Sequence, residues 1–226
     1  MVNQIPDVVV LRLPIYIRAL AHLEEKGIET ISSQELGEHL RVTPAQIRKD
    51  LSYFGKFGKQ GRGYNIKHLL TQLRRILGLD REWKMILVGV GRLGHAIAGY
   101  EGFAAHGFHI AAAFDTDPEI VGTRVGELEV KNVSELINTA REEKEQIAIL
   151  AVPASKAQEV TDVLVQAGTR AILNYVPIAL RVPRGVWVRE IDPVAALQSM
   201  TYYLNIPKKA TMSKSTSGRK KVAVSS

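Results

Sequence analysis

The stretch KMILVGVGRLG, residues 84–94, decides the fold of the second half of the chain. Its first five residues form an apolar run typical of a buried strand, and its glycines have the spacing GxGxxG. In that pattern Gly89 permits a tight turn, Gly91 lets a pyrophosphate approach the backbone, and Gly94 lets a helix pack closely on the strand. The residues expected to hold the pyrophosphate are Gly89, Val90, Gly91, Arg92, Leu93 and Gly94.

An acidic residue follows the glycines at the distance that a dinucleotide site requires. A second apolar strand, residues 108–114, leads into Asp115, 21 residues after Gly94. An acid at this spacing accepts hydrogen bonds from the adenine ribose. A carboxylate there repels the 2′-phosphate of NADP(H), so the sequence predicts NADH and NAD⁺ as cofactors. A glycine turn without a ligand is the alternative, which the three elements at this spacing disfavour.

The remaining pattern predicts an α/β fold. A helix should follow the glycine loop to about Ala105, and a second should end near Ala167. Further apolar strands are expected at 146–152, 170–174 and 186–190. Strands that alternate with helices in this way form a Rossmann-like, doubly wound parallel sheet.

Basic residues are concentrated in two segments. The 226 residues carry a formal net charge of +7, from 30 Lys and Arg against 23 Asp and Glu. Residues 41–75 hold nine basic residues and one acid, and residues 207–226 hold six basic residues and no acid. A solvated helix face normally carries both signs, so the first segment predicts a surface that binds nucleic acid. The second has no aromatic residue and little apolar periodicity, which predicts a disordered tail.

Residues 6–54 have the pattern of a helix-turn-helix. Apolar spacing predicts a first helix over 6–26, ended by Gly27. A capping-box pattern begins a second helix over about 33–40, and an N-cap threonine followed by proline begins a third over about 44–54. The third helix turns a basic, hydrogen-bonding face outward, as does a helix that enters the major groove of DNA.

Residues 55–64 contain four glycines and three cations, and they predict a β-hairpin wing beside the third helix. The glycines permit the hairpin turn and a close approach to a backbone, and the cations would lie over phosphates. The expected partner is double-stranded operator DNA. The residues expected to contact it from the third helix and the wing are Pro44, Gln46, Arg48, Lys49, Ser52, Tyr53, Lys56, Lys59 and Arg62.

Composition excludes several classes of protein. Without cysteine the chain has no disulfide framework, no thiolate metal site and no cysteine nucleophile, which fits a reducing cytoplasm. We expect no metal. We also expect no membrane partner, because no apolar run approaches the roughly 18 to 20 residues of a spanning helix. The N-terminus lacks the basic leader and small-residue cleavage site of a signal peptide.

The sequence offers little to an enzyme. All six histidines precede residue 110, and the nucleotide fold uses up residues 81–206, so no segment is left to bind a hydride-accepting substrate. Lys156 and Tyr100 could be recruited as proton donors, but a surface lysine and a packed tyrosine are the simpler interpretations. We expect no catalytic residue.

With these features the chain resembles the Rex family of redox-sensing transcriptional repressors. The resemblance runs along nearly all of residues 8–204. It implies a homodimer in which NADH and NAD⁺ compete for the second domain, and in which NADH closes the dimer and releases operator DNA. Besides the glycine loop and the wing, it rests on QIRKDLSYFG (46–55), FDTDP (114–118), AVP (151–153), ILNYVP (172–177) and YYLN (202–205).

The resemblance also implies roles that spacing does not show. It places Arg12 near the DNA backbone, and it places the last helix, about Pro193 to Leu204, on the partner subunit between its two domains. It links Arg18, Tyr100 and Asp192 in a polar switch between the domains. For Arg18 and Asp192 taken separately, the alternative is a surface ion pair of little energetic consequence. The implied walls of the nicotinamide end are Val152, Pro153, Asn174, Tyr175 and Pro177.

We therefore expect a winged-helix DNA-binding domain over 1–80 and an NAD(H)-binding domain over 81–192. A domain-swapped dimerisation helix should follow over 193–206, and a disordered basic tail over 207–226. Two rival functions stay open. An NAD-dependent oxidoreductase with an accidental basic patch would show substrate-dependent turnover of NADH. A coenzyme-A-binding module shares the same sheet, and it would bind acyl carriers and ignore NADH.

Overall fold

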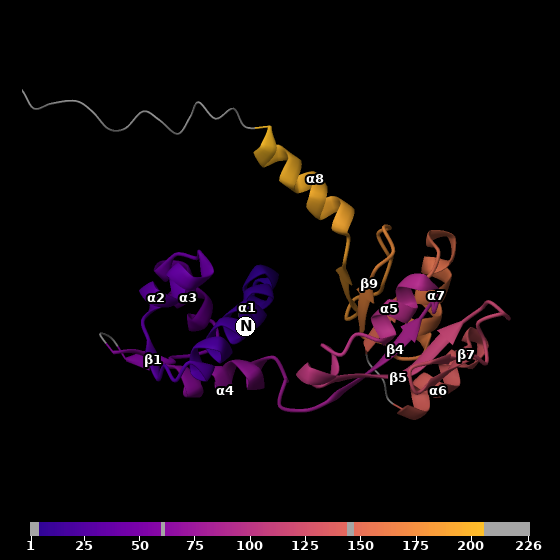
Figure 1. Ribbon diagram of the computed structural model, residues 1–226, viewed down its shortest axis with the longest axis horizontal. Coiled ribbons are helices and arrows are strands. Elements are labelled where there is room, and N and C mark those ends of the chain that lie inside the picture. The colour runs from indigo at the N-terminus through magenta and orange to yellow at the C-terminus, as the bar shows by residue number, and fades with distance from the viewer. Residues whose placement is uncertain (1–4, 60–61, 144–146, 206–226) are drawn as a thin grey trace, which may run out of the picture. The chain divides into compact units, whose positions relative to one another are not determined.

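The chain divides into two compact units. One extends to Lys84 and includes Tyr100–Ile110, and the other combines Met85–Gly99 with the chain from Ala111 onward. The expected tail, 207–226, lies outside the described residues. The computed structural model (Figure 1) describes three stretches: 5–59, 62–143 and 147–205.

The N-terminal unit is a small helical domain with a short sheet. Helix α1 packs against α4, and α2 packs against α3. Their apolar faces share one core, in which Leu13, Tyr16, Leu36, Ile47 and Leu69 are fully buried. The three expected helices are present, with ends within two residues of those predicted. The elements are α1 (Asp7–Glu25), β1 (Thr30–Ile31), α2 (Ser33–Leu40), α3 (Pro44–Ser52), β2 (Gly58–Lys59), β3 (Gly63–Asn65) and α4 (Ile66–Ile76).

Helices α2 and α3 begin at capping residues that the sequence predicts. The Ser32 hydroxyl accepts a hydrogen bond from the Glu35 N–H at 3.1 Å, and the Glu35 carboxylate accepts one from the Ser32 N–H at 2.8 Å. This reciprocal pair is the predicted capping box. The Thr43 hydroxyl accepts from the Gln46 N–H at 3.2 Å, and Pro44 stands in the first turn of α3, where its missing N–H costs nothing.

The expected hairpin forms the wing, and it belongs to a three-stranded sheet of order β1-β3-β2. β2 pairs with β3 antiparallel, with Gly58 opposite Tyr64. β1 pairs antiparallel with the other edge of β3, with Ile31 opposite Tyr64. The sequence did not predict β1, because a two-residue strand is too short to show alternation. Since Ser32 follows β1 and caps α2, this pairing anchors the wing at the start of α2.

The rest of the described chain builds a seven-stranded sheet with the strand order β10-β9-β8-β4-β5-β7-β6. The expected strands and the helix after residue 153 are present. The elements are β4 (Trp83–Val88), α5 (Arg92–Ala98), η1 (Ala104–His106), β5 (Phe108–Asp115), β6 (Arg124–Val125), β7 (Leu128–Asn132), η2 (Val133–Glu135), α6 (Leu136–Glu143), β8 (Ile147–Leu150), α7 (Ala154–Gln166), β9 (Ala171–Asn174), β10 (Trp187–Glu190) and α8 (Pro193–Leu204).

The topology is that of a dinucleotide-binding sheet. From β4, the chain adds β5 and β7 on one side and β8, β9 and β10 on the other, so the strand order reverses beside β4. The pairs β4–β8, β8–β9, β9–β10 and β5–β7 are parallel, which confirms the doubly wound sheet. β6 adds an antiparallel edge through the two-residue loop Gly126–Glu127, as edge strands of such sheets often do. The core contains Ile86, Phe114 and Leu150.

Two parts of this unit differ from the sequence predictions. Helix α5 was expected to reach about Ala105, but it ends at Ala98. Gly99 takes the cap position, where its N–H donates to the His95 carbonyl at 3.1 Å, and the chain then forms only the short 3-10 turn η1. Residues 124–143 form β6, β7 and α6, which the sequence did not predict because the strands are short and their apolar pattern is weak.

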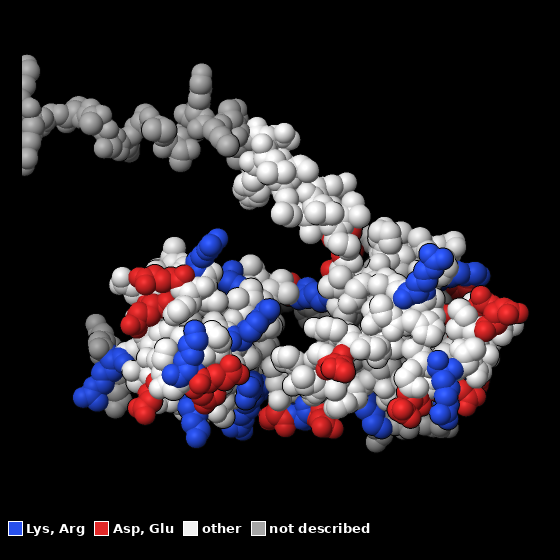
Figure 2. All heavy atoms as spheres, viewed as in Figure 1, with Lys and Arg blue, Asp and Glu red and all other residues white. Residues whose placement is uncertain are grey.

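Helix α8 presents its apolar side chains to solvent within this chain. The Asp192 carboxylate accepts from the N–H groups of Val194 at 2.8 Å and Ala195 at 3.1 Å, and so caps the helix where Pro193 begins it. Its sequence contains no charged residue, and Figure 2 shows it as a continuous uncharged surface. Leu197 is 62% exposed. Across the described parts of the chain, no helix is both long enough and apolar enough to cross a membrane.

Candidate nucleotide and DNA sites

The glycine loop joins β4 to α5 at the carboxyl end of the sheet, and its three glycines serve different purposes. Gly89 has a φ of 94°, and a side chain there would meet the backbone of Ala151. A side chain on Gly94 would meet the carbonyl of Gly89. At Gly91 a side chain would meet no protein atom within 4 Å. The fold therefore requires Gly89 and Gly94, whereas the space at Gly91 remains open for a ligand.

The structure brings Asp115 to this loop. Asp115 ends β5, next to β4 in the sheet, and its Oδ2 accepts a hydrogen bond from the Val90 N–H at 2.7 Å. Its Oδ1 accepts from the N–H groups of Thr116 at 2.7 Å and Asp117 at 3.0 Å. These three bonds hold the carboxylate in one orientation beside the glycines. The predicted pairing of loop and acid is therefore present in the fold.

Residues expected at the nicotinamide end follow the carboxyl ends of β8 and β9. Because these strands are parallel to β4, their carboxyl ends lie at the same edge of the sheet as the glycine loop. Val152 and Pro153 lead into α7, and Tyr175 and Pro177 follow β9. Asn174 is fully buried, and its amide donates to the Ile178 carbonyl at 3.0 Å and accepts from the Val176 N–H at 2.9 Å. Its side chain therefore shapes this loop from inside.

The basic side chains of α3 and the wing are largely exposed. Arg48, Lys49 and Ser52 on α3 and Lys56 and Arg62 on the wing face solvent. The Arg48 guanidinium donates to the Ser33 hydroxyl at 2.8 Å, so it is held against the start of α2. Pro44, Gln46 and the C-cap residue Tyr53 are half-buried, so each leaves part of its surface accessible. The side chain of Lys59 is not among those described.

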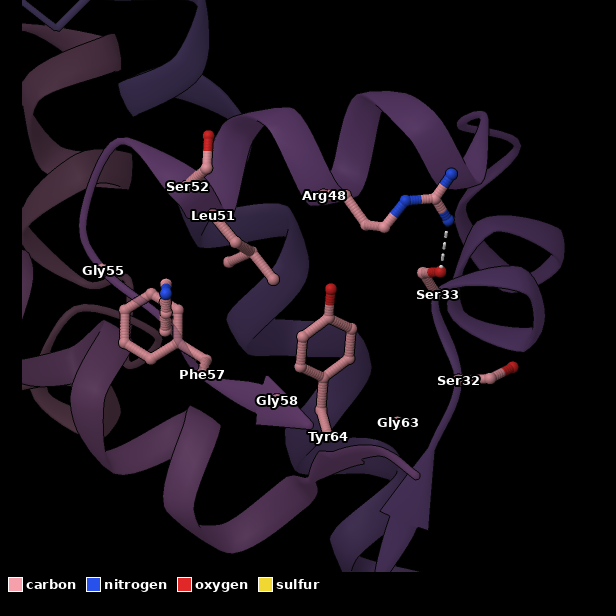
Figure 3. A pocket seen from close by; sticks show the side chains of 11 residues that line it. Ser32, Ser33, Arg48, Leu51, Ser52, Gly55, Phe57, Gly58, Gly63 and Tyr64 are labelled. Atoms are coloured by element: carbon pink, nitrogen blue, oxygen red, sulfur yellow. Dashed lines mark hydrogen bonds between the residues drawn. The ribbon is translucent and has the colours of Figure 1, made fainter. Parts of the chain in front are cut away.

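A cavity of about 650 Å³ lies between the start of α2, the end of α3 and the wing. Figure 3 shows Arg48 reaching across its rim to Ser33, while Tyr64 projects from β3 into it. Burial raises the pKa of the Tyr64 phenol, and the charge of Arg48 offsets only part of that rise. The hydroxyl therefore remains protonated and able to donate. The cavity is lined by Ser32, Ser33, Arg48, Leu51, Ser52, Gly55, Lys56, Phe57, Gly58, Gly63 and Tyr64.

A buried carboxylate joins α1 to α3. Asp50 is fully buried, and Arg12 donates to it through Nε at 2.6 Å and Nη2 at 2.7 Å. The Tyr16 hydroxyl donates to the same carboxylate at 2.6 Å, and Gln46 Nε2 donates at 2.7 Å. Removing one partner of a buried ion pair typically costs about 3–5 kcal/mol, so this cluster fixes α3 against α1. The resemblance places Arg12 near DNA, but two of the three guanidinium nitrogens of Arg12 donate to Asp50.

The role of Asp50 was not predicted from the sequence, in which Asp50 is the single acid of the basic segment 41–75. The available signal was its position beside Ile47 and Leu51 on the apolar face of α3, because a carboxylate there must find a partner.

The three residues of the implied switch lie on separate elements. Arg18 is exposed on α1, and Asp192 caps α8. Tyr100 follows α5, is 61% exposed, and stacks edge-on against Phe103 with ring centroids 5.0 Å apart. The link between them stays a prediction. Among the described residues, no group of three or more His, Asp or Glu side chains is placed to hold a metal ion.

The fold and the two sites define a two-domain protein in which a winged helix-turn-helix precedes a dinucleotide-binding sheet. Two family models match these parts: one described as "Putative DNA-binding protein N-terminus" over residues 4–52, and one described as "CoA binding domain" over residues 80–178. Curated relatives extend along nearly the whole chain. The chain belongs to the family of the redox-sensing transcriptional repressor Rex.

Similar proteins of known name support that assignment. The Rex repressor of Chloroflexus aggregans is 57% identical over 89% of this chain and 95% of its own length. That of a Roseiflexus species is 58% identical over 88% and 90%. A crystal structure of RSP, solved with β-NAD⁺ and operator DNA, is 40% identical, covers 90% of this chain and 94% of its own, and has a TM-score of 0.86. A structure of RSP with β-NADH is 38% identical over 90% and 95%, with a TM-score of 0.81.

Proposed function

We propose that this chain is a DNA-binding transcriptional repressor that senses the NADH/NAD⁺ ratio. NADH binding closes a homodimer and releases operator DNA, and NAD⁺ competes for the same site. The observation that carries the proposal is the Asp115 carboxylate fixed beside an open Gly91, in a chain whose first domain carries a basic winged helix. RSP, with a similar sequence and fold, was crystallised with NAD⁺ and operator DNA and, in a separate structure, with NADH.

The residues at the carboxyl edge of the sheet fit a dinucleotide. The open space at Gly91 would take the pyrophosphate, and Asp115 would accept hydrogen bonds from the adenine ribose. A bound NADH carries its redox state in the nicotinamide ring. The loop from Gly89 to Gly94 would hold the phosphates, and the walls of the nicotinamide end would be Val152, Pro153, Tyr175 and Pro177, shaped from below by Asn174.

The charge of Asp115 also argues against the rival ligand suggested by the "CoA binding domain" match. Coenzyme A carries a phosphate on its adenine ribose, and a fixed carboxylate beside that ribose would repel it. NAD(H) has free ribose hydroxyls, which can donate to the carboxylate. This chemistry favours NAD(H) over both coenzyme A and NADP(H).

The N-terminal domain, residues 1–80, supplies the DNA contacts in this proposal. α3 would lie in the major groove and the wing beside the backbone. The exposed cations Arg48, Lys49, Lys56 and Arg62 would neutralise phosphates, as would Lys59. The half-buried Arg12 would reach the backbone with the part of its guanidinium that Asp50 does not hold. Pro44, Gln46, Ser52 and Tyr53 would complete the contact surface.

The exposed apolar faces support a homodimer. α8 leaves Leu197 and Tyr203 at 62% and 72% exposure, which is unusual for large apolar side chains in a soluble monomer. α1 carries a second exposed stripe at helical spacing, formed by Val8, Leu11 and Ile15. A swapped helix over 193–206 that packs on the partner subunit would cover both kinds of surface. Two recognition helices would then enter successive major grooves about one helical turn apart.

The remaining assignments follow from placing DNA binding in the first domain and cofactor binding in the second. Residues 81–192 would bind the cofactor. The polar switch between the open and the closed dimer would be formed by Arg18, Tyr100 and Asp192. The protein would act in the cytoplasm. It would not be an enzyme, because in the described part of the chain the sheet leaves no segment to bind a second substrate.

Displacement of DNA by the two cofactors tests the proposal. The full chain is bound to the duplex that it selects from a randomised double-stranded library, and NADH, NAD⁺ and coenzyme A are titrated into the complex. NADH lowers DNA affinity only if it prefers the closed dimer over the DNA-competent one. We expect release by NADH, little release by NAD⁺ and none by coenzyme A. Equal release by NADH and NAD⁺, or release by neither, would contradict the sensor function.

A further inference from the structure

The amide of Gln46 is held in one orientation by the buried Asp50. Gln46 Nε2 donates to Asp50 Oδ1 at 2.7 Å, one helical turn along α3. Both oxygens of Asp50 are already engaged by stronger donors: Arg12 at 2.6 and 2.7 Å, and Tyr16 at 2.6 Å. The carboxylate therefore cannot rotate to follow Gln46, and the amide must adapt to it.

The charge state of Asp50 makes this orientation obligatory. Burial raises the pKa of the Asp50 carboxyl, but the hydrogen bonds from Arg12, Tyr16 and Gln46 outweigh burial and lower it below its ordinary value. An ionised carboxylate only accepts hydrogen bonds. The oxygen end of the Gln46 amide would be repelled by it, so the nitrogen end must face inward.

The amide atoms of Gln46 that do not contact Asp50 form an edge with a fixed order of hydrogen-bond donor and acceptor. One N–H is committed to Asp50, which leaves the carbonyl Oε1 as acceptor and the second N–H as donor. Gln46 is the third residue of α3, and the N-terminal residues of a recognition helix are those that contact base edges. Gln46 is only partly buried, which leaves part of the residue accessible from outside the domain.

That edge matches one base in the major groove. Adenine offers the N6 amino group as donor and N7 as acceptor, and a glutamine amide pairs with both at once. Guanine places two acceptors there, O6 and N7, and O6 would face the fixed Oε1. Cytosine offers only the N4 donor and could make one of the two bonds.

We propose that Gln46 recognises an adenine in each operator half-site, and that Asp50 is the positioning residue that fixes this preference by holding the amide in its donor-inward orientation. The inference rests on the proposed DNA binding by α3, and it adds the base and the residue pair that specify it.

The first experiment compares the sequences selected by two proteins. Wild type and Gln46→Ala, both as full chains, are each used to select duplexes from the same randomised library. Wild type should select an adenine, placed symmetrically in the two half-sites, at a position where Gln46→Ala shows no preference. All other selected positions should be unchanged. If both proteins retain the same adenine, or if wild type selects cytosine at the position that Gln46→Ala relaxes, the inference is wrong.

Base analogues then test the two bonds separately. In the wild-type duplex, the adenine is replaced in one half-site by 7-deazaadenine, which lacks N7, or by purine, which lacks the N6 amino group. A bidentate contact is worth a discrimination of roughly 5- to 150-fold. Each analogue should weaken wild-type binding by several-fold and leave binding of Gln46→Ala within about two-fold. An analogue that weakens both proteins equally would exclude contact with Gln46.

Variants of the buried cluster test the positioning role. Asp50→Asn lets either end of the Gln46 amide face inward, so the preference for adenine over guanine should fall towards that of Gln46→Ala. Tyr16→Phe is the matched control, because it removes a hydrogen bond from the same carboxylate without touching Gln46. Tyr16→Phe should lower the unfolding temperature and keep the full adenine preference. If Asp50→Asn does not fold, Arg12→Met/Asp50→Asn removes the unpaired charge, and its base preference is measured instead.

The outcomes separate this inference from the proposed function. If wild type selects no sequence, DNA recognition itself fails. If wild type selects an operator but Asp50→Asn or its double variant keeps the full adenine preference, the positioning role fails while the repressor function stands.

Discussion

At the scale of single residues, the proposed function makes cofactor choice depend on the Asp115 side chain. Its three hydrogen bonds to backbone N–H groups hold the carboxylate beside the glycine loop. Asp115→Asn keeps the size of the side chain but removes the charge that ribose hydroxyls would bind. Hydrogen bonds to charged groups are worth about 1.5–3 kcal/mol, so NADH affinity should fall roughly 10- to 150-fold, as measured by calorimetry or fluorescence titration.

Asp117→Asn supplies the comparison for that measurement. Asp117 lies two residues further along and forms a similar turn, in which its carboxylate accepts from the Glu119 N–H at 3.0 Å. Its replacement should leave NADH affinity within about two-fold. Equal losses for Asp115→Asn and Asp117→Asn would mean that the loop as a whole, and not the ribose contact, had been disturbed.

Asp50 makes the stability of the N-terminal domain sensitive to acid. The hydrogen bonds of the cluster lower the pKa of its carboxyl below the ordinary 3.8. A depressed pKa contributes stability that is complete above the unfolded value and is lost as pH falls through the folded value. The free energy of unfolding should therefore decrease as pH falls below about 3.8. Urea titrations at several pH values should show a shallower decrease for Asp50→Asn, and an equal slope would remove Asp50 as a cause.

At the scale of elements, the turn between β4 and α5 separates the needs of the fold from those of the ligand. A side chain on Gly94 would collide with the Gly89 carbonyl, whereas one on Gly91 meets open space. Gly94→Ala should therefore lower the free energy of unfolding by about 1–3 kcal/mol. Gly91→Ala should keep the wild-type unfolding temperature within a few degrees and lose at least ten-fold in NADH affinity. A Gly91→Ala variant with normal NADH binding would show that no pyrophosphate lies there.

Helix α8 is the element on which dimerisation depends in this account. Leu197→Asp places a charge on its exposed apolar face, and burying an unpaired charge in an interface is strongly unfavourable. Sedimentation should therefore show monomers for Leu197→Asp at concentrations where wild type is a dimer. Ser199 lies two residues further along α8, about 200° around the helix axis from Leu197, and it is exposed on the opposite face. Ser199→Asp should remain dimeric, and two variants that behave alike would refute the role of α8.

Sequence patterns predicted the elements that carry strong local signals. Such signals depend only on residues close together in the chain, so a single sequence is enough to detect them. They include the capping residues Ser32 and Thr43 and the glycine spacing after β4. The short strand β1 and the β6–β7 hairpin depend on pairing with distant partners, and two-residue strands leave no periodicity to detect. The end of α5 was missed because Gly99 stopped a run that otherwise favoured a helix.

The candidate sites were predictable to different degrees. The pairing of the glycine loop with Asp115 followed from spacing, because parallel strands bring consecutive carboxyl ends together. The Arg12–Asp50–Gln46 cluster joins residues 38 positions apart and depends on how α1 packs on α3. No local pattern contains that information. Asn174 likewise was expected at the ligand, and the fold uses its amide to brace the loop after β9.

At the scale of the whole molecule, DNA binding and cofactor binding are assigned to parts of the chain that differ in charge. The single segment 41–75 has nine basic residues and one acid, and it forms the recognition helix and wing of the N-terminal unit. The sheet that follows carries the dinucleotide features. A repressor of this design must couple the two through the dimer, because NADH can weaken DNA binding only by favouring a conformation that DNA disfavours.

Thermodynamic reciprocity gives the most direct test of that coupling. The dissociation constant of NADH is measured with and without a saturating selected duplex, and that of the duplex with and without saturating NADH. If the two ligands prefer different states of one dimer, both constants must rise by the same factor, and allosteric couplings are typically about 5- to 150-fold. We predict equal factors in this range for NADH and a much smaller factor for NAD⁺. An NADH dissociation constant that is unchanged by the duplex would contradict the account.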